Sequence, residues 1–96
     1  LANNITIDVQ GSGDALLNNV TTGSGTVAIT AAGAIDSEAG SVITTTGTAN
    51  LAAGTGITAL TTVANLSANN STSGAVSITE TNGLTINGTG ITNDGN

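Results

Sequence analysis

Basic, aromatic and sulfur-containing side chains are all missing from this sequence, together with proline and histidine. Without Lys or Arg the net charge is −6, which excludes the basic surfaces that bind nucleic-acid phosphates or anionic membranes. The lack of cysteine excludes disulfides, zinc–thiolate sites and thiol redox chemistry. Aromatic side chains normally supply much of the buried area of a globular core. The 96 residues must therefore build a thin core from Leu, Ile, Val and Ala.

Catalytic chemistry has few candidates in such a composition. Most nucleophile–base pairs need His, Cys, Lys or Tyr, and none of these is present. Paired carboxylates can hydrolyse glycosidic bonds, but the aromatic platforms that usually hold a sugar are absent as well. The six carboxylates are Asp8, Asp14, Asp36, Glu38, Glu80 and Asp94. We predict no enzyme activity and no catalytic residue.

A regular spacing of about 22 residues relates the aliphatic positions in the first half of the chain. Ile29 follows Ile7 at this spacing, and Leu51 follows Ile29 at the same spacing. The next match, Ile78, lies further along the chain than the spacing would place it. We assign the extra residues to a polar loop at 68–73, with the sequence ANNSTS. The prediction is a single domain over residues 1–96, with four coils that begin near residues 3, 25, 50 and 74.

Within each coil, aliphatic residues alternate with small polar ones, as Val27 and Ile29 do with Ala28 and Thr30. A period of two predicts strands with one buried face, and the Gly, Asn and Ser clusters between them supply corners. We predict an all-β fold without α-helix, a right-handed parallel β-solenoid whose coils stack about 4.8 Å apart. An antiparallel β-sandwich has similar strand spacing, but it gives no reason for the longer repeat.

Calcium is the one metal that the carboxylates suggest. Asp36 and Glu38 lie two positions apart, and Asp14 precedes Asp36 by one full repeat, so we expect Asp14 and Asp36 to stack on adjacent coils. Oxygen clusters of this kind can bind Ca²⁺. The motifs of EF-hands and calcium-binding β-rolls are absent, so solvated corner carboxylates are the simpler interpretation. No other metal or cofactor is predicted.

Threonine clusters at 44–46 and 79–81 suggest an alternative function, a surface that orders water as ice. Such a surface needs threonine ladders, yet the residues one repeat after Thr6 and Thr30 are Ala28 and Ala52. Thr is also a common residue on the outer face of any strand. We keep ice binding as an alternative behind the structural functions below.

Three stretches, VAITAAGAI (27–35), NLAAGTGIT (50–58) and VSITETNGLTING (76–88), resemble the repeats of large secreted bacterial adhesins. They are most similar to filamentous-haemagglutinin-like proteins of two-partner secretion systems and to autotransporter passenger domains. The resemblance covers about residues 3–92. It implies an extracellular or cell-surface bacterial protein whose shaft is a right-handed parallel β-helix. It carries over no catalytic or ligand-binding residue, and those adhesins contain many more repeats than four.

The ends of the predicted solenoid carry no capping segment that we recognise. An uncapped end exposes unpaired backbone groups and part of the aliphatic core. We expect neighbouring repeats of a longer chain, or further copies of this chain stacked head to tail, to cover it. The predicted function is therefore an extracellular fibre or shaft unit, in a filament or in a large adhesin, with the chain itself as partner. The alternative is an adhesive module for a host or matrix surface, although the aromatic and Arg anchors typical of such patches are absent.

Overall fold

The computed structural model describes residues 4–9, 11, 13–38, 40–80 and 85–93. Every regular element among them is a β-strand, and this part of the chain contains no helix long and apolar enough to cross a membrane. The strands are β1 (Ile5–Val9), β2 (Ala15–Leu17), β3 (Val20–Thr21), β4 (Val27–Ala31), β5 (Ile35–Ser37), β6 (Ile43–Ala53), β7 (Ile57–Asn70), β8 (Val76–Glu80) and β9 (Thr85–Asn93). Neighbouring strands pair in parallel throughout. The all-β prediction is confirmed.

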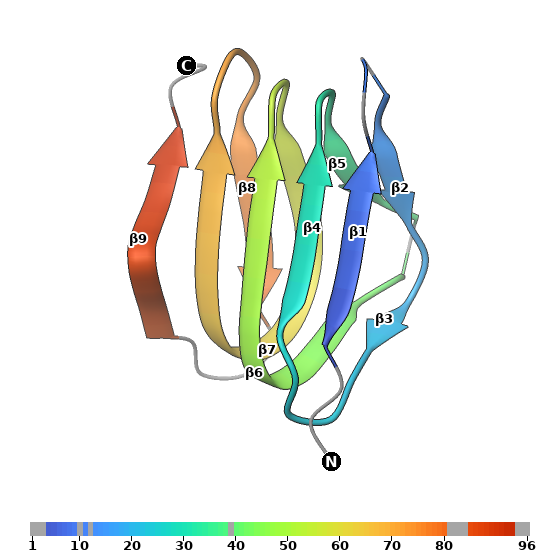
Figure 1. Cartoon of the computed structure of the whole chain (residues 1–96), viewed down its shortest axis with the longest axis vertical. Helices are drawn as coiled ribbons and strands as arrows, with labels where there is room; N and C mark the ends of the chain where they lie inside the picture. Colours follow the sequence, from blue (N-terminus) through green and yellow to red (C-terminus); the bar gives the residue numbers. More distant parts are fainter. Residues whose placement is uncertain (1–3, 10, 12, 39, 81–84, 94–96) are drawn as a thin grey trace.

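The strands wind as a right-handed β-solenoid of about four turns. In Figure 1 the chain rises along the near side, turns over at the top, descends on the far side and steps to the left with each turn. The near or front side consists of β1, β4, the second halves of β6 and β7, and β9. The rear side consists of β2, β5, the first part of β7, and β8. A short third side joins rear to front and contains β3, the start of β6 and the middle of β7.

The register confirms the predicted repeat for the first two steps of the front side. Ile7 pairs with Ile29, and Ile29 pairs with Leu51. The following step uses fewer residues, because the partner of Leu51 is Ala68. Ile78 pairs with Ala59 on the rear side, so the prediction that it stacks on Leu51 is wrong. The fourth front strand begins near residue 65 instead of 74, and the predicted first coil start at residue 3 lies outside the described residues.

The polar run at 68–73 is not an inserted loop as predicted. Residues 68–70 belong to β7 and pair with residues 51–53 of β6, and only residues 71–73 lie in the turn that follows. The third coil is shorter for a different reason. In the second coil, residues 38–42 separate β5 on the rear side from β6 on the third side. Strand β7 instead passes from the rear side to the third side without a turn, which removes residues from the coil.

Three aliphatic rows that run through successive coils supply much of the core. The first front row is Ile5, Val27, Ala49, Leu66 and Ile86; the second front row is Ile7, Ile29, Leu51, Ala68 and Ile91; the rear row is Ala15, Ile35, Ile57 and Val76. The middle members are almost completely buried, with exposed fractions of 0 to 2%. Strands stacked at about 4.8 Å leave little space between coils. At the turn after β6, for example, a Cβ on Gly54 would collide with the carbonyl oxygen of Ala32 in the coil before.

Candidate functional site

Asp14 and Asp36, the two carboxylates expected to stack on adjacent coils, do not meet. The register of the rear side pairs Asp36 with Leu16. The prediction is wrong because the first rear step, from Ala15 to Ile35, uses fewer residues than the front step beside it. Asp14 is therefore two positions out of line with Asp36. Its Oδ1 accepts a hydrogen bond from the backbone of the next coil instead, at 2.8 Å.

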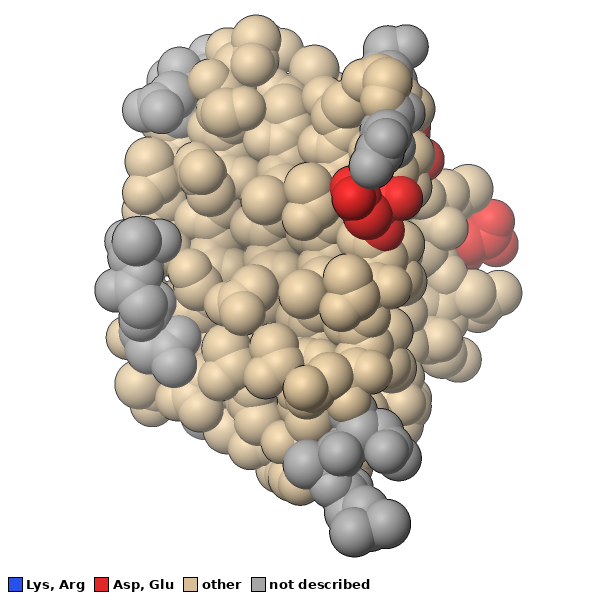
Figure 2. Space-filling view, viewed as in Figure 1, with Lys and Arg blue, Asp and Glu red and all other residues tan. Residues whose placement is uncertain are grey.

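The other proposed calcium ligands have equally local surroundings. Asp36 Oδ1 accepts a hydrogen bond from the backbone N–H of Ser37 at 2.8 Å, and Glu38 is exposed after β5. Among the described residues, no three Asp, Glu, His or Cys side chains lie close enough together to hold a metal ion. Figure 2 shows acidic side chains over β1 and beside it, and the other described residues visible on this side are uncharged. Calcium binding thus stays a prediction without support from the geometry.

Among the described residues, three threonine side chains stack in a short ladder on the third side. Its members are Thr21, Thr44 and Thr62. On the front side the ladder is broken, since Thr30 pairs with Ala52; Thr81 lies outside the described residues. A surface that orders water in two dimensions needs several parallel columns of such residues. One column gives the ice-binding alternative no specific support.

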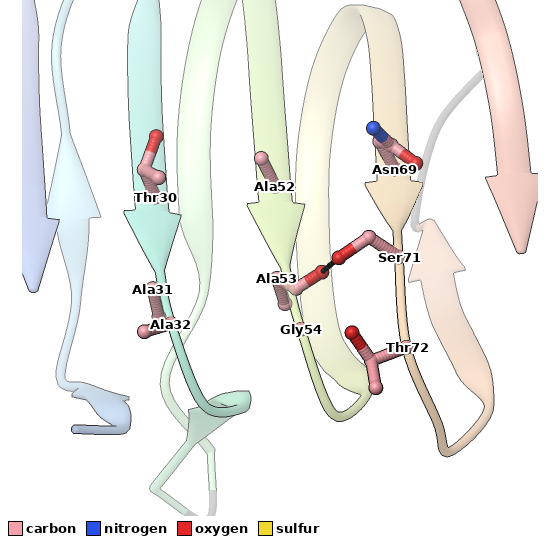
Figure 3. A pocket seen from close by; sticks show the side chains of 9 residues that line it. All are labelled: Thr30, Ala31, Ala32, Ala52, Ala53, Gly54, Asn69, Ser71 and Thr72. Atoms are coloured by element: carbon pink, nitrogen blue, oxygen red, sulfur yellow. Dashed lines mark hydrogen bonds between the residues drawn. The ribbon is translucent and has the colours of Figure 1, made fainter. Parts of the chain in front are cut away.

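A shallow groove of about 210 Å³ crosses the turn from the front side to the rear side. Figure 3 shows its lining, which comes from β4, β6, β7 and the turns after them. Only small side chains contribute: Thr30, Ala31, Ala32, Ala52, Ala53, Gly54, Asn69, Ser71 and Thr72. The hydroxyl of Ser71 is directed back to the carbonyl of Ala53, at 3.4 Å. The groove has no aromatic or charged side chain to hold a ligand and follows from the small residues at this turn.

Asn70 is a fully buried polar residue at the end of β7. Its Oδ1 accepts a hydrogen bond from the backbone N–H of Gly56 at 2.8 Å. Its Nδ2 donates to the carbonyls of Ser73 and Gly74, at 2.9 and 3.2 Å, and to Oδ1 of Asn93 at 2.9 Å. One amide thereby ties together two turns and strand β9. This role was not predicted, because Asn70 was expected to lie in a loop.

Glu80 supplies hydrogen-bond acceptors on the third side, next to the last coil. At the equivalent position of the first coil, the backbone N–H of Thr22 donates to the carbonyl of Thr44 in the next coil, at 3.0 Å. The N–H of Val63 donates instead to Oε2 of Glu80, at 3.1 Å. The hydroxyl of Thr61 donates to Oε1 of the same carboxylate, at 2.5 Å. A side chain thus takes the place that a main-chain carbonyl has at the start of the solenoid.

The aliphatic rows are unfinished at both ends of the solenoid. Strands β1 and β9 each pair with one strand only among the described residues. At the first end, Ile5 and Ile7 are partly buried against the core. At the other end, Ile86 and Ile91 are each 46% exposed, although they pair with buried residues of β7. At each end, a strand that has a neighbour on one side only among the described residues carries aliphatic side chains directed toward the interior. We take these two end surfaces as the candidate functional surfaces of the molecule.

No protein-family model, curated protein or solved structure matches the chain. Its function is therefore inferred from the residues and their geometry.

Proposed function

We propose that the chain is a structural unit of an extracellular or cell-surface fibre, a β-solenoid shaft extended at its ends by coils of the same kind. One observation carries the proposal. Both front rows run through every coil and end at Ile86 and Ile91, which stack on buried residues of β7 and are exposed at one end of the solenoid. A contact between this end and the opposite end uses two different surfaces, so it does not close on itself and propagates into a filament.

The extending coils are further copies of the chain or neighbouring repeats of a longer one. The second arrangement is that of an adhesin shaft of the filamentous-haemagglutinin type. A bacterial cell-surface location agrees with the absence of Lys and Arg, because such a chain offers trypsin no cleavage site.

A structural role fits the surface better than catalysis or adhesion does. Protein-binding hot spots are enriched in Trp, Tyr and Arg, none of which occurs in the chain. The groove at the front-to-rear turn offers only small uncharged side chains. Many polar side chains are used between coils, as Asn19 Oδ1 is for the backbone N–H of Val42 at 2.9 Å. An adhesive module is the alternative, and we do not favour it for these reasons.

Sedimentation velocity over a range of protein concentrations tests the proposal. We expect the sedimentation coefficient to rise with concentration, and to rise further in about 1 M salt. Copies that each carry a charge of −6 repel one another, and salt at that concentration shortens the Debye length to about 3 Å. A chain that stays monomeric at every concentration and salt would contradict the assembly of isolated copies.

Two matched variants connect the result to the exposed end. Ile91→Asp places a charge in the second front row where it is 46% exposed, so assembly should weaken while the free energy of unfolding changes by less than about 1 kcal/mol. Asn50→Asp is the control. Asn50 is exposed on the outer face of β6 and lies between β4 and β7, away from both ends, so the same added charge should leave assembly nearly unchanged. Equal effects of both variants would mean that charge alone, and not the end of the row, controls assembly.

A further inference from the structure

We propose that the C-terminal end of the solenoid docks on the N-terminal end of a second copy in the register that continues both front rows. In this contact Ile86 lies against Ile5 of the second copy, and Ile91 lies against its Ile7. The inference rests on the proposed function and specifies the partner and the contacts.

The positions of the inward-facing residues on the front strands support a second copy as the partner. Within the molecule, each front strand packs on the next through the same two rows, and these rows begin at Ile5 and Ile7 and end at Ile86 and Ile91. A second copy placed one coil beyond β9 supplies the next aliphatic residue of both rows. The register between β7 and β9 shifts between Leu66 and Ala68. Despite this shift, Ile86 and Ile91 still lie on the inward face of β9, because both pair with buried residues of β7.

The rear row does not continue in the same contact. It has four members, from Ala15 to Val76, whereas each front row has five. A second copy whose β1 stacks on β9 therefore leaves one rear position open between Val76 and its own Ala15, and Ala15 is already buried, with an exposed fraction of 4%. The front strands β9 and β1 carry the contact.

Polar groups at the corners of the last coil do not obstruct this contact. The carboxylate of Glu80 turns back to Thr61 and Val63 of its own chain. Asn93 Oδ1 accepts a hydrogen bond from Asn70 Nδ2, at 2.9 Å. Both groups are satisfied within the molecule, so docking does not require their removal from water without a partner.

The alternation of β1 specifies the register. A slip of one residue exchanges the two faces of a strand. It would bring Thr6 or Asp8 of the second copy against Ile91 in place of Ile7. Burying an unpaired carboxylate or hydroxyl in that position is unfavourable. The proposed register is therefore preferred over registers shifted by one residue, and the stack has a defined geometry.

Cysteine pairs test this geometry, because the chain contains no cysteine of its own. Asp8, Thr30, Ala52, Asn69 and Thr92 form one outward row on the front side. In the proposed register, Asp8 of the second copy continues this row next to Thr92. Parallel strands lie about 4.8 Å apart, within the Cα separation of roughly 4.4 to 6.8 Å that a disulfide allows. The variant Asp8→Cys/Thr92→Cys should therefore form a ladder of covalent oligomers after mild oxidation, seen on a non-reducing gel.

The variant Thr6→Cys/Thr92→Cys is the matched control. Its cysteines are two residues out of line, roughly 8 Å apart between Cα atoms at the strand rise of about 3.3 Å, which is too far for a disulfide. All three positions are exposed, so both variants should fold. Within one molecule the two ends are separated by four coil steps, about 19 Å, so an internal bond cannot form.

The possible results separate the register from the proposed function. A ladder in the first variant only supports the proposed contact. Ladders of equal yield in both variants, or no ladder in either although the protein assembles in sedimentation, overturn this register and leave the proposed function standing. No ladder and no assembly overturn both the second copy as partner and the self-assembly on which it rests.

Discussion

Asn70 takes an interior position that Ala53 holds one coil earlier. The exchange of a methyl group for an amide is tolerated because every polar atom of the amide has a partner: Gly56, Ser73, Gly74 or Asn93. In the part of the chain that the structure describes, no buried side-chain nitrogen or oxygen lacks a hydrogen-bond partner. The polar residues of the interior therefore act as ties between turns.

Asn70→Ala should be strongly destabilising. The substitution removes one acceptor and the donors of three hydrogen bonds, and it leaves the backbone N–H of Gly56 buried without its partner. Losses of this kind cost about 1 to 3 kcal/mol each, so we expect a decrease of about 3 kcal/mol in the free energy of unfolding, measured by urea denaturation.

Asn69→Ala, the adjacent exposed position on the same strand, is the matched control for this change. It should alter the free energy of unfolding by about 0.5 kcal/mol or less. Similar losses for both variants would show that the buried network contributes nothing particular.

The roles of Asn70 and Glu80 could not have been predicted from the sequence. Each depends on which backbone groups lie opposite in the neighbouring coil, and that depends on coil lengths that change from turn to turn. Asp36 and Glu38 show the same limit. Their local spacing was plain, but the partner of Asp36 proved to be Leu16, because the rear step of the first coil is shorter in sequence than the front step.

The rows of the front side are the elements that hold the coils together. Val27, Ala49 and Leu66 each have an exposed fraction of 0%, and Ile29 in the neighbouring row has 1%. The strands that carry them are packed on both sides by equivalent strands. With no aromatic side chain present, these stacked methyl and methylene groups supply the hydrophobic stabilisation, at about 25 cal/mol per Å² of apolar surface removed from water.

Ile29→Ala tests the contribution of one row member. Replacement of a buried Ile by Ala costs about 2 to 5 kcal/mol, since it combines lost transfer free energy with a cavity. Chemical denaturation should give a value in that range. Thr30→Ala on the same strand changes an exposed residue and should stay within about 0.5 kcal/mol. A loss below about 1 kcal/mol for Ile29→Ala would mean that the interior adjusts and that the row is not closely packed.

Alternation revealed the strands but not the side on which each one lies. Residues 25–31 and 74–80 have nearly the same pattern, and both were therefore predicted to begin a coil. Strand β4 lies on the front side, while β8 lies on the rear side beside β7. Front and rear strands have the same inward and outward alternation. Only the number of residues between corners distinguishes them, and β7 lacks one of the expected corners.

The whole molecule measures 34 × 23 × 21 Å. With coils spaced about 4.8 Å apart, four turns are no longer along the solenoid axis than they are wide. A single copy is therefore no shaft by itself, and a fibre requires many such units in line. The charge of −6 opposes their approach, while the unfinished aliphatic rows favour it. End-to-end assembly is the balance of these two effects.

Cryo-electron microscopy of the purified chain, under the salt conditions that favour assembly, tests the central claim most directly. Head-to-tail stacking continues the coils, so every strand lies across the filament and the coil spacing runs along it. We predict unbranched filaments with a strong repeat of about 4.8 Å parallel to the filament axis. Separate particles at every concentration, or filaments in which that repeat runs across the axis, would contradict the account.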